Sequence, residues 1–169
     1  MNSLTKQYGT FTVEFSIVAI ALSFLLAFTF DVVSKQSVKG KLDRLSHSAV
    51  NVIKERTQLY PEQPNIDESN IETVHGILKQ SLTRTMGDFS ELKFGAIYEQ
   101  FIGSTGQVES IPKGLNCTQK KNIEGLKHLS PITSFDRKAS LYQVTLCYEV
   151  TGWTSIFSDN ESTIISLTP

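Results

Sequence analysis

Hydrophobic side chains dominate one continuous stretch near the N-terminus of the chain. Glu14 is the only charged residue between positions 10 and 30. After position 15 the stretch contains three polar side chains, which are Ser16, Ser23 and Thr29. As an α-helix rising about 1.5 Å per residue, positions 10–30 would be roughly 31 Å long, which matches the hydrocarbon thickness of a bilayer. The pattern therefore predicts a transmembrane helix over residues 10–30.

The main alternative for this stretch is a cleaved secretory signal. The apolar core of such a signal has about 7 to 15 residues and ends at a site of the small-x-small type. Here the apolar stretch is longer, and it ends in Phe28-Thr29-Phe30-Asp31, which contains no such site. The sequence therefore favours a retained membrane anchor.

An amphipathic pattern follows directly after the apolar stretch. Charged residues occupy the other faces, while apolar residues recur at helical spacing: Val38, Leu42, Leu45, Ala49, Val52 and Ile53. The helix should end by Tyr60, because Pro61 disfavours the α conformation of the residue before it. Residues 31–60 are therefore predicted to extend the transmembrane helix, with one face buried.

A second helix is predicted from about Ser69 to Met86, after a polar loop over residues 61–70. Ser69 and Glu72 have the spacing of a capping box, and Gly87 is a typical C-terminal stop. Apolar residues between them form one helical stripe: Ile71, Val74, Leu78, Leu82 and Met86.

The rest of the chain shows strand patterns. Residues 142–150 alternate strictly between apolar and other side chains and form the clearest predicted strand. Three more strands are predicted at Leu92–Ile102, Val108–Ile111 and Ser162–Leu167, with a turn at residues 103–106 and a long irregular segment from Lys113 to Lys138. Residues 61–169 are therefore predicted to form a domain that gives the protein an α+β fold, with the long N-terminal helix packed on a small antiparallel sheet.

Charge and motif content indicate a protein without catalytic chemistry. Sixteen basic and seventeen acidic residues give a net charge of −1, with no block of like charge that would indicate a nucleic-acid partner. The three histidines, His47, His75 and His128, lack metal-ligand spacing. No phosphate-binding loop or nucleophile motif is present either. We therefore expect no enzymatic activity, no metal site and no cofactor.

A short motif leads into the apolar stretch: Gln7-Tyr8-Gly9-Thr10-Phe11-Thr12-Val13-Glu14-Phe15. Gly9 lacks a Cβ and lets a protease approach the backbone closely, although a simple loop glycine is an alternative. A carboxylate in an apolar helix costs up to about 3 kcal/mol when it lies deep, so Glu14 should have a partner or reach the headgroups. If cleavage freed the amine of Thr10, that amine and Glu14 would lie four residues apart on one helical face. The amine of one subunit could then pair with Glu14 of its neighbour.

Gly9, a glutamate five positions later and a membrane-length helix together resemble the N-terminus of a type IV prepilin. Three further segments are similar to the TadE/TadF family of the tight-adherence (Flp/Tad) pilus, and to its TadF branch: Lys39–Arg44, Glu55–Tyr60 and Leu141–Glu149. The resemblance implies a minor pilin, or pseudopilin, with a leader over residues 1–9 that a prepilin peptidase removes between Gly9 and Thr10. It also implies that assembly contacts are made by Glu14, Phe11, Val13 and Phe15.

The same resemblance implies partners and a location. The partners would be the major Flp-type pilin, a TadE-like minor pilin, the pilus assembly platform, the prepilin peptidase and the membrane. The chain would cross the bacterial inner membrane once and place its domain in the periplasm, from which it could enter the extracellular pilus. A single-pass periplasmic binding or sensor module is the main alternative, and such a module would not need cleavage after Gly9. A periplasmic hydrolase is a second alternative.

Two cysteines, Cys117 and Cys147, lie well after the apolar stretch. An even number of cysteines in an exported domain favours one disulfide, whereas the same pair in the cytosol would be free thiols. The charges that flank the apolar stretch lean weakly towards the opposite orientation, so export rests on the processing motif. We expect a Cys117–Cys147 disulfide, with two buried thiols as the alternative.

Overall fold

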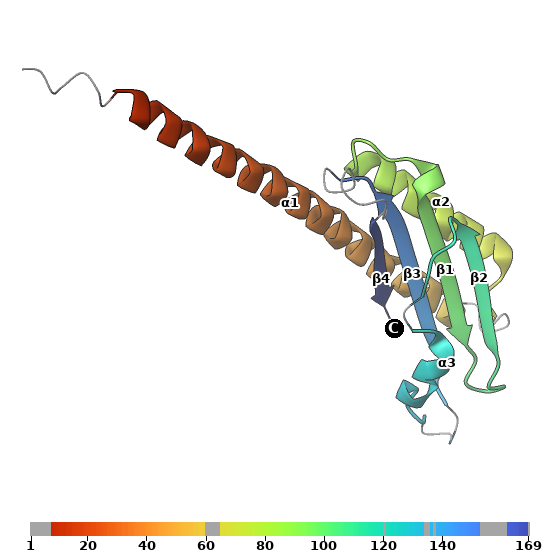
Figure 1. Ribbon diagram of the computed structural model, residues 1–169. Helices are drawn as coiled ribbons and strands as arrows, with labels where there is room; N and C mark the ends of the chain where they lie inside the picture. Colours follow the sequence, from red (N-terminus) through yellow and green to blue (C-terminus); the bar gives the residue numbers. More distant parts are fainter. Residues whose placement is uncertain are drawn as a thin grey trace, which may run out of the picture.

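The computed structural model describes residues 8–59, 65–119, 121–133, 136, 138–152 and 162–168. At both ends of the first range, residues 8–10 and 56–59, and along residues 162–168, the description is limited to the backbone. Figure 1 shows a long helix that carries a small α+β domain at its C-terminal end. The predicted fold class is confirmed.

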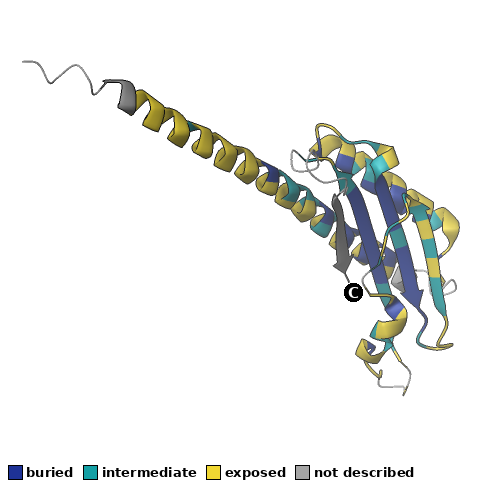
Figure 2. Ribbon diagram, viewed as in Figure 1, coloured by how far each residue is buried: buried dark blue, intermediate teal, exposed yellow. Residues whose placement is uncertain are grey.

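The long helix α1 (Tyr8–Leu59) is continuous over 52 residues. It ends one residue before Tyr60, as the position of Pro61 predicts. Its first part projects away from the domain and its second part packs against the sheet, so the burial of α1 changes along its length (Figure 2). This change follows the switch from an all-apolar to an amphipathic sequence pattern.

The second helix, α2 (Glu68–Thr85), matches the predicted element within one residue at each end and stops before Gly87, but the predicted capping box is wrong. Asp67 occupies the N-cap without a side-chain capping bond, and Ser69 Oγ donates a 2.6 Å hydrogen bond to Asp67 Oδ2. Ser69 therefore lies inside the helix, where it cannot form a capping box. At the other end Met86 is extended, and Gly87 does not adopt the positive φ of a glycine stop.

Four antiparallel strands form one sheet in the order β2-β1-β3-β4. Their bounds are β1 (Phe94–Phe101), β2 (Val108–Gly114), β3 (Leu141–Val150) and β4 (Ser162–Thr168). The predicted turn between the first two strands is confirmed: Ile102 donates to the Gln107 carbonyl at 2.9 Å, and Gly106 has φ +72°. That angle lies in the left-handed region, which suits a residue without a Cβ.

Two strand boundaries differ from the predicted ones by more than one residue. The first strand begins later than Leu92, because Glu91–Lys93 form a 3-10 turn that leaves Leu92 almost fully exposed. The second strand continues past Ile111 through Pro112 to Gly114, since a proline is tolerated on a strand at the edge of a sheet. Local pattern did not reveal which strand would be an edge.

The hydrophobic core lies between α1, α2 and one face of the sheet. It contains residues from α1 and α2, together with alternate residues of β1 and β3: Leu42, Ala49, Val50, Ile53, Ile71, Val74, Leu78, Leu82, Phe94, Ala96, Tyr98, Val144, Leu146 and Tyr148. The strict alternation predicted for the third strand is confirmed, because Val144, Leu146 and Tyr148 all lie in the core. Successive side chains of a strand point to opposite faces, so alternate residues share one face.

The opposite face of β1 and β3 is crossed by the segment between β2 and β3. This segment contains two short elements, α3 (Ile123–Leu126) and a 3-10 turn at Lys127–Leu129. A bridge pairs Ile132 with Lys138. The predicted irregular segment therefore has local structure, and Ile123 from α3 is fully buried.

Candidate functional site

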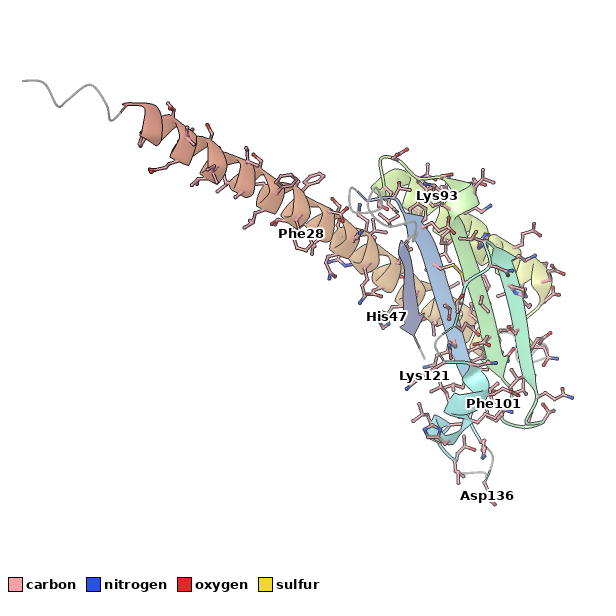
Figure 3. All side chains as sticks on the ribbon, viewed as in Figure 1. Phe28, His47, Lys93, Phe101, Lys121 and Asp136 are labelled. Carbon is pink, nitrogen blue, oxygen red and sulfur yellow. A yellow bond between two sulfur atoms is a disulfide. The ribbon has the colours of Figure 1, made fainter. Side chains whose placement is uncertain are left out.

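The projecting part of α1 exposes nearly all of its apolar side chains. Phe11, Phe24 and Phe30 are each about 70% exposed, and the residues between them are similarly open. Figure 3 labels Phe28 on this part of the helix, before the helix reaches the sheet. The segment has the length and composition to cross a membrane. In water such a surface would cost free energy, so it requires a lipid or protein environment.

Polar side chains in the apolar stretch are already satisfied by the helix itself. Ser16, Ser23 and Thr29 each donate a hydrogen bond to the carbonyl four residues earlier, at 2.7 to 2.8 Å. Such bonds remove free hydroxyl donors from a region where water is absent. Residues 15–30 are therefore compatible with a bilayer along their whole length.

Glu14 is exposed on the projecting helix and has no ion-pair partner within the part of the chain that the structure describes. The neighbouring side chains predicted to make assembly contacts are also open: Phe11 is 70%, Val13 61% and Phe15 65% exposed. The Phe11 and Phe15 rings are nearly parallel, with centroids 6.5 Å apart. A carboxylate and two aromatic rings therefore lie on the first turns of the helix, where no other described residue covers them.

The predicted cleavage residues, Gly9 and Thr10, lie in the first turn of α1, which begins at Tyr8. Their side chains are outside the described residues, as is the whole of the predicted leader before Tyr8. Cleavage after Gly9 therefore stays a prediction.

The projecting helix meets the domain at Asp31. Phe30 is 71% exposed, whereas Asp31 is 5% exposed and forms a 2.9 Å ion pair with Lys35 one turn later. Gly152, just after β3, packs directly on this carboxylate: a Cβ there would collide with Asp31 Oδ1. The contact joins the end of the apolar stretch to the end of a central strand.

Cys117 and Cys147 form the predicted disulfide, with their Cα atoms 5.9 Å apart. The bridge ties the segment after β2 to the middle of β3. Gly95 on β1 lies directly beneath it, where a Cβ would be 2.9 Å from each sulfur atom and would collide with the Leu115 carbonyl oxygen. The disulfide therefore depends on a position without a side chain.

The three histidines occupy separate environments. His47 is exposed on α1, and His128 Nδ1 lies 2.9 Å from the Gly125 carbonyl. His75 is buried in the core, 3.2 Å from Tyr98 Oη, and stacks on Phe94. Burial lowers the pKa of His75, so its neutral form is favoured. No cluster of three potential metal ligands occurs among the residues that the structure describes.

Two buried carboxylates were not identified as structural residues from sequence. Asp31 was counted only as a charge after the apolar stretch, and Glu99 lies on the disulfide-bearing face of β1 with 2% exposure. Burial raises the pKa of Glu99, partly offset by a hydrogen bond from the Ile123 backbone N–H. The sequence does not indicate that Glu99 is buried, because a polar residue alternating with apolar ones normally lies on the water-facing side of a sheet.

A membrane-length apolar helix that continues into a small, disulfide-bonded α+β domain defines the class of membrane-anchored, pilin-like subunits. The chain belongs to the TadF family, whose model, described as "Putative tight adherence pilin protein F", matches residues 2–167. This match covers nearly the whole chain and confirms the family predicted from the N-terminal motif and the three later segments. No curated protein and no solved structure matches the chain at a significant level.

Proposed function

We propose that the chain is a minor pilin, or pseudopilin, required for assembly of a tight-adherence (Flp/Tad) type IV pilus, and that it has a structural rather than an enzymatic role. The observation that carries this proposal is the projecting part of α1. It exposes a membrane-length apolar surface interrupted by one carboxylate, Glu14, in a chain of a pilin family. This helix anchors the chain in the inner membrane, and the same surface of the helix contacts other pilins in the assembled pilus.

Processing creates the partner for Glu14. A prepilin peptidase cleaves after Gly9, and the new amine of Thr10 carries a positive charge. In a bundle of parallel helices this amine pairs with Glu14 of the neighbouring subunit. Such a pair is strong in a low-dielectric bundle because an unpaired charge there is costly. Exposure of Glu14 on α1 supports a contact with another chain.

An exported domain accounts for the Cys117–Cys147 disulfide, since such bonds persist in the periplasm and are rare in the cytosol. The domain therefore lies on the periplasmic side, where it meets the major Flp-type pilin, a TadE-like minor pilin and the assembly platform. The membrane helix and the domain then contact different parts of the same assembly.

The test replaces Glu14 with alanine in a strain that carries the variant as its only copy. We expect Glu14→Ala to enter the membrane at a normal level, because removing a charge makes the span more apolar. Piliation should be lost. Mass spectrometry of the wild-type protein should show a mature chain that begins at Thr10.

Ser16→Ala is the matched control, because Ser16 lies two residues away and its hydroxyl donates a hydrogen bond to the Thr12 carbonyl within α1. Piliation of this control should be normal. Normal piliation with Glu14→Ala at a normal protein level, or an intact leader in cells with active peptidase, would instead indicate an ordinary membrane-anchored module.

A further inference from the structure

The sheet has two edge strands, β2 and β4, and each pairs on one side only among the described residues. An edge strand presents unpaired N–H and C=O groups that can bind another extended chain. The register of the sheet determines which residues of each edge direct these groups outward.

The hydrogen bond from Leu115 N to Phe94 O sets this register. Phe94 therefore directs its backbone groups to β2. Neighbouring residues of a strand direct these groups to opposite sides, so the even-numbered residues of β1 bond to β2 and the odd-numbered ones bond to β3. Through the Gly95–Cys147 pair, the even-numbered residues of β3 then bond to β4. Through the Tyr148–Ile164 pair, the even-numbered residues of β4 bond back to β3. Three residues of β4 therefore direct their N–H and C=O groups to the free edge: Thr163, Ile165 and Leu167.

The other edge is protected by its sequence. The same register directs the backbone nitrogen of Pro112 outward from β2, so this edge lacks an N–H donor at its centre without losing a bond to β1. Charged residues, Glu109 and Lys113, flank the proline. Prolines and charges on an edge strand are the usual means by which proteins prevent strand addition.

The free edge of β4 has neither kind of protection. Its sequence, Ser162 to Thr168, contains no charged residue and no proline, and three of its seven residues are isoleucine or leucine. In Figure 1, β4 is the outermost strand on the side from which α1 reaches the domain. Helices that pack on the exposed surface of α1 would therefore bring their own domains close to this edge.

Orientation in the membrane restricts what can pair there. In Figure 1, β4 runs away from the projecting end of α1, in the same general sense as α1 itself. Antiparallel pairing of β4 with β4 of a second copy would point the two membrane helices in opposite directions, so the two copies could not share one bilayer in one orientation. The β2 strand of a second copy runs in the required sense, but Pro112 blocks its edge.

We propose that the free edge of β4 binds an extended, uncharged segment of a different subunit of the same pilus, as an added antiparallel strand. Recognition is by backbone hydrogen bonds to Thr163, Ile165 and Leu167, a mode in which the main chain provides affinity. This proposal rests on the proposed function, because it requires neighbours anchored in the same membrane.

The experiment uses the full-length chain in cells that make all pilus subunits. A photoreactive amino acid replaces Thr163, and its adducts are identified by their peptides. We expect adducts that contain another pilus subunit. Adducts with only a second copy of the chain, or no adduct, would overturn the proposal.

Two variants at position 165 test the backbone contact in the same assay. Ile165→Pro removes one outward N–H without removing a bond to β3, as Pro112 does on β2, and the adduct should be lost. Ile165→Ala changes the side chain but keeps the N–H, so the adduct should remain. An intact Cys117–Cys147 disulfide and normal protease resistance serve as the folding control. An adduct that persists in a folded Ile165→Pro protein would contradict the proposal.

The two proposals can fail separately. Lost piliation with Glu14→Ala, combined with no adduct at position 163, would leave the pilin function standing and reject the edge contact. Normal piliation with Glu14→Ala would reject the proposed role of the helix, whatever the cross-linking result.

Discussion

The residue type at some positions of the domain is explained by the atoms packed around that position. Gly95 is an example, because β1 passes directly under the disulfide and under the Leu115 carbonyl oxygen. A glycine in the interior of a strand usually weakens it, and here the close approach of two other segments explains its presence. The residues next to Gly95 in the sequence do not indicate this close packing.

We expect Gly95→Ala to destabilise the domain by about 1 to 3 kcal/mol, the range for forcing extra atoms into a packed site. The added methyl group would meet backbone and sulfur atoms that cannot move independently. Urea unfolding of the domain would measure the loss. Gly125→Ala is the control, since a Cβ there has no heavy atom within 4 Å, and it should unfold like the native domain.

His75 gives the domain a predictable dependence on pH. Burial lowers its pKa, and the nearby charges of Lys79 and Lys113 lower it further against a small opposing effect of Glu91. In the unfolded chain the imidazole titrates near pH 6.5, so below that pH the unfolded state binds more protons than the folded state. The contribution of His75 to stability is therefore present above about pH 6.5 and is lost as the pH falls towards its folded pKa.

The free energy of unfolding, measured in urea between about pH 5 and 7.5, should fall less steeply on acidification in His75→Gln than in the native domain. Glu99 has the opposite effect on the pH dependence of the free energy of unfolding, because its pKa is raised, but this effect is the same in both proteins. Equal slopes in the native domain and in His75→Gln would contradict the prediction.

At the scale of elements, the segment between β2 and β3 depends on a few attachments. Its helix α3 has four residues, too few to be stable alone, so the disulfide and buried Ile123 hold it on the sheet. Gln143 Nε2 adds a 2.9 Å hydrogen bond to the Lys121 carbonyl.

Breaking the disulfide with Cys117→Ser should lower the free energy of unfolding by roughly 3 to 4 kcal/mol in the chain-entropy model, given the separation of 30 residues. Denaturant unfolding would measure this loss, and proteolysis should begin between residues 115 and 140. Thiol reductant should destabilise the native domain by a similar amount and leave the variant unaffected. A variant as stable as the native domain would show that packing alone holds the segment.

At the scale of the whole molecule, α1 divides into a part that needs other molecules and a part that belongs to the domain. The division falls at Asp31, where exposure drops from 71% at Phe30 to 5%. Beyond this point, α1 supplies core residues that include Leu42, Ala49 and Ile53.

Removing the apolar part should therefore release a folded, soluble domain. Chains that begin at residue 31 or at residue 38 should both elute as monomers in size-exclusion chromatography. The longer chain should be more stable by roughly 0.3 to 1 kcal/mol, the scale of an i,i+4 ion pair, because it keeps the Asp31–Lys35 contact. Aggregation of both chains, without cooperative unfolding, would show that the domain is not self-contained.

The sequence by itself determined the features that depend on local pattern. Residues 10–30 specify an apolar helix, strict alternation specifies β3, and Pro61 sets the end of α1, because each depends on side-chain periodicity or on one backbone constraint. The N-terminal motif, together with the segments Lys39–Arg44, Glu55–Tyr60 and Leu141–Glu149, was also sufficient for the family.

Only the tertiary structure decided the features that join distant segments. Sequence could not show that Glu99 would be covered by α3, that Gly95 would lie under a disulfide, or that Asp31 would be buried against Gly152. The same limit applies to the sheet edges: Pro112 and the uncharged residues of β4 acquire a meaning only when strand order places them outermost. Burial and edge position are properties of how the elements pack together, and a residue's local sequence does not contain the element that will cover it.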